Sequence, residues 1–181
     1  MLIKTIFSGF GGQGVLSMGN AVATAAMLEG KHVTYFPSYG AEVRGGTANC
    51  TVSVSDEEIA SPVASEPEFV VAMNQPAFVR FQNLLVSGGL ALVNASMVSV
   101  ASVRGDIEVV EVPTSELAEK LGNIKVANMI MLGAFIRVSS IVSFPRLLKN
   151  LPDILGAKRE RLLKINQQAL ELGHTFVKEG Q

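Results

Sequence analysis

The sequence has too few metal-binding side chains to hold a metal cluster without help from another chain. Its 181 residues include a single cysteine, Cys50, and two histidines, His32 and His174. An iron–sulfur cluster takes about four thiolates, and a structural zinc ion about four Cys or His ligands. Cys50 lies in an alternating polar–apolar segment, where a small buried side chain is expected. We therefore predict no metal-binding residue in this chain.

Charged residues are also scarce, at 17% of the sequence against roughly 25% in ordinary soluble domains. Hydrophobic residues make up 48% of the sequence. None of them is tryptophan, and most have small, aliphatic side chains. The longest apolar run covers residues 126–136 between Lys125 and Arg137, well short of the about 20 residues that a spanning helix needs. The N-terminus resembles a strand and not a signal peptide. We expect a cytoplasmic protein without a membrane span, whose apolar surface is covered by other subunits.

Two functional classes lack the residues that they require. The formal net charge is −1 and no basic stripe is present, which argues against nucleic-acid binding. The chain has no G-x-S-x-G elbow, no H-E-x-x-H pair and no Cys–His pair with an orienting residue. We predict no catalytic residue, and we expect both histidines to be structural or solvated.

Short apolar segments alternate with helical segments along most of the chain. Strands are predicted at residues 2–7, 32–36, 49–55, 68–73, 90–93 and 107–112, and helices at 15–29, 76–85, 113–121, 127–138, 144–150 and 157–172. The first strand, helix and second strand predict a parallel pair joined by a right-handed crossover. Without a recognisable linker, residues 1–181 form one domain. We predict a three-layer α/β domain with a largely parallel sheet.

A glycine-rich loop, Gly9-Phe-Gly11-Gly-Gln-Gly14, follows the first strand and fits G-x-G-x-x-G. Its glycines permit a tight turn, and the helix N-terminus after it offers free N–H groups to a phosphate. Val15 and Leu16 stand where a Walker A loop has Lys and Ser/Thr, and the second strand ends without the acid of an NAD site. The loop predicts a phosphate cradle to which Gln13 could add a donor. A turn that only packs the first helix is the alternative.

A second polar loop follows the second strand, at the sheet edge that carries ligands in open α/β folds. It contains Glu42, Arg44, Gly45 and Gly46. Arg44 has the planar fork that binds phosphate or carboxylate, and Glu42 could orient it or face a partner chain. An ordinary surface Glu–Arg pair is the alternative. The later segment Asn74-Gln-Pro76 could line the same crevice or simply begin a helix.

These segments together resemble the gamma-type subunit of 2-oxoacid:ferredoxin oxidoreductases. The resemblance covers nearly the whole chain and rests on Gly9-Phe-Gly-Gly-Gln-Gly14, Pro37-Ser-Tyr-Gly-Ala-Glu-Val-Arg-Gly-Gly-Thr-Ala-Asn49, Ile59-Ala-Ser-Pro62, Asn74-Gln-Pro76 and Asn166-Gln-Gln-Ala-Leu-Glu-Leu-Gly173. The glycine loop combined with Glu-x-Arg-Gly-Gly is far more specific than either motif alone.

The resemblance implies a Rossmann-like fold associated with coenzyme A, within an enzyme that converts a 2-oxoacid and coenzyme A to acyl-CoA, carbon dioxide and reduced ferredoxin. Thiamine diphosphate, Mg and the iron–sulfur clusters would lie on partner subunits. The expected coenzyme A phosphate loop consists of Gly9, Gly11, Gly12, Gln13 and Gly14. The residues expected to face the crevice or the thiamine-bearing partner are Glu42, Arg44, Gly45 and Gly46.

The sequence of the second loop resembles the 2-oxoglutarate and branched-chain members of this family more than the pyruvate members, which favours 2-oxoglutarate as the substrate. Two alternatives stay open. One is a stand-alone sensor that binds a nucleotide, and the other is a scaffold subunit of the same complex that binds nothing.

Overall fold

The computed structural model describes residues 1–39, 46–63, 65–100, 104–156 and 162–179. The strands are β1 (Leu2–Phe10), β2 (His32–Tyr39), β3 (Thr47–Ser55), β4 (Phe69–Ala72), β5 (Leu90–Asn94) and β6 (Glu108–Val112). The α-helices are α1 (Val15–Leu28), α2 (Gln75–Phe81), α3 (Thr114–Lys120), α4 (Ala127–Ser139), α5 (Phe144–Lys149), α6 (Leu151–Leu155) and α7 (Leu163–Glu179). Two 3₁₀ turns, η1 (Gln82–Leu84) and η2 (Ile124–Val126), follow α2 and precede α4.

The six strands form one sheet in the order β2-β3-β1-β4-β5-β6. Strands β1, β4, β5 and β6 pair in parallel, whereas β3 runs antiparallel to both of its neighbours, β1 and β2. The mostly parallel sheet was predicted, but the direct pairing of the first two strands was wrong. Strand β3 lies between them and pairs with both, while Cys50, Val52 and Val54 on one of its faces pack into the core beneath α1.

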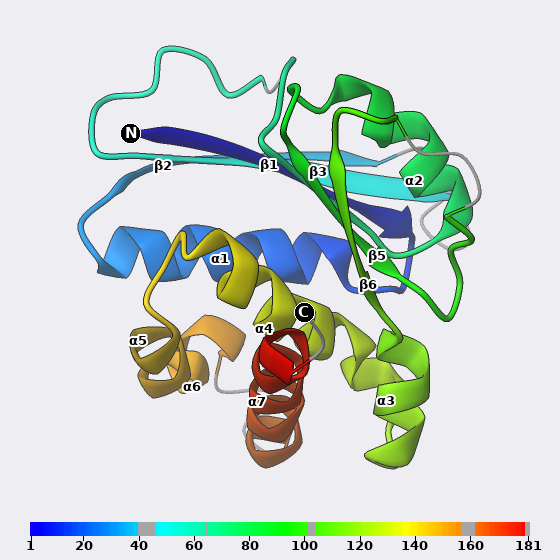
Figure 1. Ribbon diagram of the computed structural model, residues 1–181. Coiled ribbons are helices and arrows are strands. Elements are labelled where there is room, and N and C mark those ends of the chain that lie inside the picture. The colour runs from blue at the N-terminus through cyan, green and yellow to red at the C-terminus, as the bar shows by residue number, and fades with distance from the viewer. Residues whose placement is uncertain (40–45, 64, 101–103, 157–161, 180–181) are drawn as a thin grey trace.

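Helices cover both faces of the sheet, which confirms the predicted α/β architecture (Figure 1). Helices α1 and α4 pack on one face, where the Phe135 ring of α4 meets Phe7 and Phe69 edge-on at centroid distances of 5.1 and 5.6 Å. Helix α7 packs against α4, and α2 packs on the opposite face through Ala77, Phe78 and Phe81. Within the described ranges, no helix combines the length and apolar character needed to cross a membrane.

The last helix differs from its prediction. It was expected to end at residue 172, with Gly173 as a stop and His174 beyond it. Instead α7 runs from Leu163 to Glu179, so both residues lie inside the helix. A Cβ on Gly173 would collide with the backbone carbonyl of Ile130 in α4. Gly173 is therefore required for the close helix crossing and does not terminate the helix.

The polar face of strand β3 was predicted to lie in water or against a polar partner, and the structure agrees only for part of the strand. Asn49 and Thr51 are half-buried, whereas Ser53 is fully buried and Ser55 nearly so. Strand β3 has neighbours on both sides, with Ser53 opposite Lys4 of β1 and Thr34 of β2. The polar alternation thus belongs to an interior strand of the sheet.

Candidate functional site

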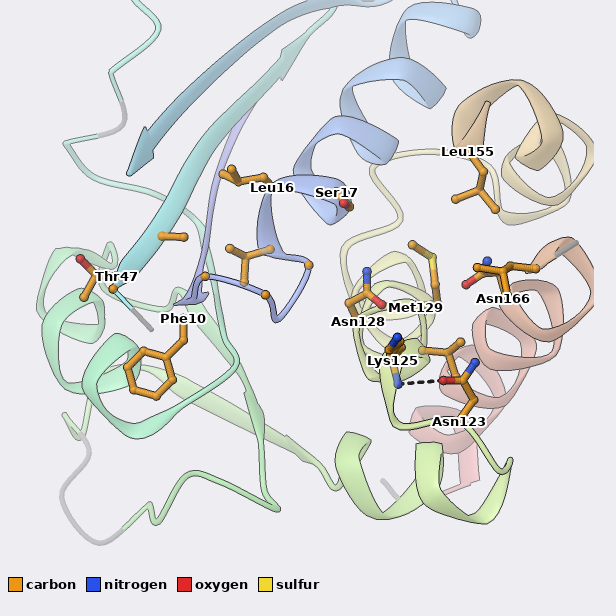
Figure 2. A pocket seen from close by; sticks show the side chains of 18 residues that line it. Phe10, Leu16, Ser17, Thr47, Asn123, Lys125, Asn128, Met129, Leu155 and Asn166 are labelled. Atoms are coloured by element: carbon orange, nitrogen blue, oxygen red, sulfur yellow. Dashed lines mark hydrogen bonds between the residues drawn. The ribbon is translucent and has the colours of Figure 1, made fainter. Parts of the chain in front are cut away.

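A cavity of about 1000 Å³ opens at the carboxyl end of β1. Figure 2 shows its walls, which come from the glycine loop, the start of β3, the start of α4, α6 and the start of α7. These segments are far apart in the sequence, and the sheet and the α4–α7 crossing bring them together. The described lining residues are Phe10, Gly11, Gly12, Gly14, Val15, Leu16, Ser17, Gly46, Thr47, Ala48, Asn123, Lys125, Val126, Asn128, Met129, Leu155, Leu162 and Asn166.

The glycine loop forms one side of this cavity, and two of its glycines have backbone conformations that other residues rarely adopt. Gly12 has a φ of 101°, and Gly14, the N-cap of α1, has a φ of 75°. Gly11, Gly12 and Gly14 line the cavity, where the sequence placed a phosphate cradle. Gly9 lies outside this lining, and a Cβ there would meet Gln13 Oε1 at 2.6 Å.

Gln13 stabilises the glycine loop through hydrogen bonds and does not line the cavity. Its Oε1 accepts hydrogen bonds from Phe10 N at 2.7 Å and Asn74 Nδ2 at 2.8 Å. Its Nε2 donates to Met73 O at 3.2 Å and Met97 Sδ at 3.4 Å. Both amide protons therefore have acceptors within the protein, which suits a positioning role better than the predicted contact to a phosphate.

The second loop meets the glycine loop at its end. The Gly11 N–H donates to the Gly46 carbonyl at 2.9 Å, and Gly46 lines the cavity, as expected for a crevice residue. The other predicted residues of this loop, Glu42, Arg44 and Gly45, lie outside the described residues. Of the second loop, the structure thus brings Gly46 and the following Thr47 to the site.

The electrostatic character of the cavity favours an anion. No side chain caps α1, whose first N–H groups point out of the helix end at the glycine loop. Helix α4 also begins at the cavity, and neither helix has an acidic residue in its first turn. Lys125 stands beside α4 without a carboxylate partner in the described ranges, and the lining residues described there include no Asp or Glu. Helix N-termini and an unpaired lysine together form a phosphate-binding environment.

Two asparagines in the cavity were not predicted as site residues. Asn128 on α4 and Asn166 on α7 are 8% and 7% exposed, and neither side chain makes a hydrogen bond to any described residue. The signal for Asn128 was a polar residue inside an almost wholly apolar helix. Asn166 gave a weaker signal, because it lies in an amphipathic helix where polar residues usually face water.

Cys50 and Asn74 do not line this cavity. The Cys50 thiol is fully buried, with Sγ 3.6 Å from Val15 O, and burial raises its pKa to about 12. This confirms the expected small, buried side chain, and a thiol with a raised pKa is a poor nucleophile at neutral pH. Asn74 caps α2, since its Oδ1 accepts from Ala77 N at 3.0 Å, so the helix-start interpretation of Asn74-Gln-Pro76 was the right one.

Comparisons with known proteins point to one group of enzymes. The sequence profile of the family described as pyruvate ferredoxin/flavodoxin oxidoreductase matches residues 4–176. Ketoisovalerate oxidoreductase subunit VorA of Methanothermobacter thermautotrophicus is 34% identical over 98% of this chain, which covers 37% of that protein. The chain therefore spans little more than a third of this relative. 2-Oxoglutarate synthase subunit KorC of Methanocaldococcus jannaschii is 33% identical, covering 95% of this chain and 92% of its own.

The fold has a solved counterpart. The crystal structure of a keto/oxoacid ferredoxin oxidoreductase gamma subunit from Geobacter sulfurreducens matches with a TM-score of 0.82 and 27% identity. The match covers 97% of this chain and 98% of that one.

Proposed function

This chain belongs to the pyruvate ferredoxin/flavodoxin oxidoreductase family, and we propose that it acts as the gamma-type subunit of a 2-oxoacid:ferredoxin oxidoreductase. In this role it binds the phosphates of coenzyme A in the glycine-loop cavity. The complete enzyme converts a 2-oxoacid and coenzyme A to acyl-CoA and carbon dioxide and passes two electrons to ferredoxin.

The observation that carries this proposal is the anion environment of the cavity. The uncapped start of α1 and the side chain of Lys125 line one volume, and no carboxylate among the described lining residues opposes them. Coenzyme A carries a diphosphate and a further ribose phosphate, and such groups bind readily at helix N-termini. The backbone of Gly12 and Gly14 lets the diphosphate approach closely, since no Cβ stands in the way.

The redox chemistry belongs to other subunits in this proposal. Thiamine diphosphate with its Mg supports decarboxylation when bound, and iron–sulfur clusters carry the electrons. One cysteine cannot hold a cluster by itself. This chain binds and orients coenzyme A so that its thiol end reaches the thiamine-bearing partner, which the expected residues Glu42, Arg44, Gly45 and Gly46 would face.

For the 2-oxoacid we favour 2-oxoglutarate, on the sequence of the second loop, Tyr39-Gly-Ala-Glu-Val-Arg-Gly-Gly46. Relatives named for 2-oxoglutarate, ketoisovalerate and pyruvate match this chain at 33%, 34% and 33% identity, so identity does not separate the substrates. The choice is tested by comparing kcat/KM for the three 2-oxoacids on one preparation of the enzyme.

The first experiment isolates the complex from its own cells under anaerobic conditions, through an affinity tag on this chain. We expect a large assembly with thiamine diphosphate and iron that oxidises a 2-oxoacid only when coenzyme A is present. A small, colourless protein without this activity would contradict the proposal and favour a stand-alone nucleotide sensor.

The site itself is tested by Lys125→Ala in the same complex. Loss of a charge-assisted contact to phosphate should raise KM for coenzyme A about tenfold or more, while KM for the 2-oxoacid stays unchanged. Lys120→Ala is the matched control, because Lys120 is an exposed lysine on α3 that does not line the cavity. Equal, small effects of both substitutions would indicate that coenzyme A does not bind in this cavity and would favour the scaffold alternative.

A further inference from the structure

The two asparagines of the cavity have no structural task within the described part of the chain. Both are more than nine-tenths buried, and neither finds a hydrogen-bond partner there. The buried amide of Asn74, by contrast, caps α2 and holds Gln13, although Gln82 Oε1 is buried without a partner. The amide atoms of Asn128 and Asn166 still reach the solvent of the open cavity, so a ligand that enters it can take up their free donors and acceptors.

The two amides lie in different surroundings. Asn128 is next to the glycine loop, since a Cβ on Gly14 would come within 2.5 Å of its Nδ2. Asn166 lies farther along the cavity, with Asn128 and Met129 between it and the glycine loop in the view of Figure 2. Met129 and Leu155 lie beside this far part in the same view, and Leu162, 46% exposed, is another apolar residue that lines the cavity. The cavity thus passes from a phosphate-binding end to an apolar end that carries one free amide.

We propose that Asn166 recognises the adenine base of the bound nucleotide, held between the apolar side chains of Met129, Leu155 and Leu162, while Asn128 donates to the adjoining phosphate. This inference rests on the proposed coenzyme A site and assigns its adenine end. An asparagine amide can accept from the exocyclic N6–H of adenine and donate to N7 at the same time, whereas the same edge of guanine presents two acceptors. Aliphatic walls suit the flat faces of the ring, because they exclude water without competing for its polar edge.

The test measures binding of adenosine 5′-diphosphate and inosine 5′-diphosphate by calorimetry on the complex purified through this chain. Inosine differs at position 6, where a carbonyl replaces the amino group and cannot donate to Asn166 Oδ1. We expect the unmodified complex to bind the adenosine form about tenfold more tightly, and Asn166→Ala to abolish this preference while keeping the weaker, phosphate-based affinity. Gln167→Ala, at the exposed neighbour on α7, should keep the preference.

A second readout separates a ligand contact from a structural role. Because Asn166 has no partner in the described protein, Asn166→Ala should leave the Tm of the ligand-free chain unchanged or raise it, whereas a structural asparagine would lower it. A lower Tm with an unaltered base preference would overturn the inference.

The remaining outcomes are also decisive. If 4′-phosphopantetheine competes with coenzyme A through Asn166 and the adenosine form does not, the amide contacts the pantetheine arm and the adenine assignment is wrong. If the unmodified complex binds none of these compounds, the proposed coenzyme A site itself fails. If the complex binds them but Asn166→Ala leaves the base preference intact, the site stands and this inference alone falls.

Discussion

At the scale of single residues, Gly14 joins the backbone of the glycine loop to the cavity wall. Replacing it with alanine forces a side chain into a φ of 75° and pushes Asn128 away. Gly30 is a matched control, with a φ of 78° and open space where a Cβ would stand. Gly30→Ala should cost about 1–2 kcal/mol of unfolding free energy for the conformation alone. Gly14→Ala should cost more and also raise KM for coenzyme A, as urea unfolding and steady-state kinetics would show.

Equal destabilisation by both substitutions, with KM unchanged, would mean that the contact between Gly14 and Asn128 has no functional weight. The kinetic comparison uses the assembled complex, so that the coenzyme A site is complete. Unfolding is measured on the chain itself, where both glycines have the same conformational requirement.

The sequence predicted one half of the site and missed the other. The glycine motif stands in one short segment, so its place between a strand and a helix could be inferred from local pattern. Lys125, Asn128 and Asn166 lie more than a hundred residues further along the chain and join the site only through tertiary packing. For Gln13 the sequence predicted a donor to phosphate, whereas in the structure its amide donates to Met73 and Met97, which no local pattern reveals.

At the scale of elements, the crossing of α4 and α7 depends on two glycines that face the opposite backbone. A Cβ on Gly173 would collide with the carbonyl of Ile130, and one on Gly133 would collide with that of Leu170. Helix propensity alone predicts that Gly173→Ala stabilises α7 by about 1 kcal/mol. We expect the opposite sign, a loss of about 1–3 kcal/mol, because the overpacked helices must separate.

Urea unfolding checks this sign, with Gln168→Ala at an exposed position of α7 as the control, expected to be nearly neutral. A stabilised Gly173→Ala variant would show that the two helices can move apart freely. Since Asn128 and Asn166 stand on these helices, separation should also weaken coenzyme A binding.

Most helices and strands could be predicted from hydrophobic periodicity and from the glycine or proline residues at their ends. Their arrangement in space was harder to predict. The place of β3 between β1 and β2 depends on pairing between distant segments, and alternation along one strand does not identify its neighbours. The same limitation explains Gly173, which has the sequence character of a helix end. Its role in the close crossing of α4 and α7 could be recognised only from the packing of the two helices.

At the scale of the whole molecule, the dependence of folding stability on pH should have a steep alkaline arm. The pKa of Cys50 is about 12 in the folded chain, against an ordinary value of 9.0, because burial disfavours the thiolate. Between these values the unfolded chain releases a proton that the folded chain keeps. Stability is therefore full below pH 9 and falls above it, by at most about 1.4 kcal/mol per pH unit.

The acid side involves different groups. Hydrogen bonds from Lys31 and the N-terminal amine lower the pKa of Asp56, and Arg104 lowers that of Asp106. A lowered carboxyl pKa stabilises the fold above its unfolded value, and that contribution disappears as the pH falls through the folded value. Both carboxylates are exposed, so solvent screening keeps this arm shallow.

Cys50→Ala isolates the alkaline arm. At pH 7 the variant should be less stable, because a buried side chain has been shortened. As the pH rises from 9 towards 12, the difference in unfolding free energy should shrink steadily, since only the unmodified chain retains a buried thiol. Two parallel stability curves would show instead that Cys50 ionises as easily in the folded chain as in the unfolded one, and that the core beneath α1 admits water.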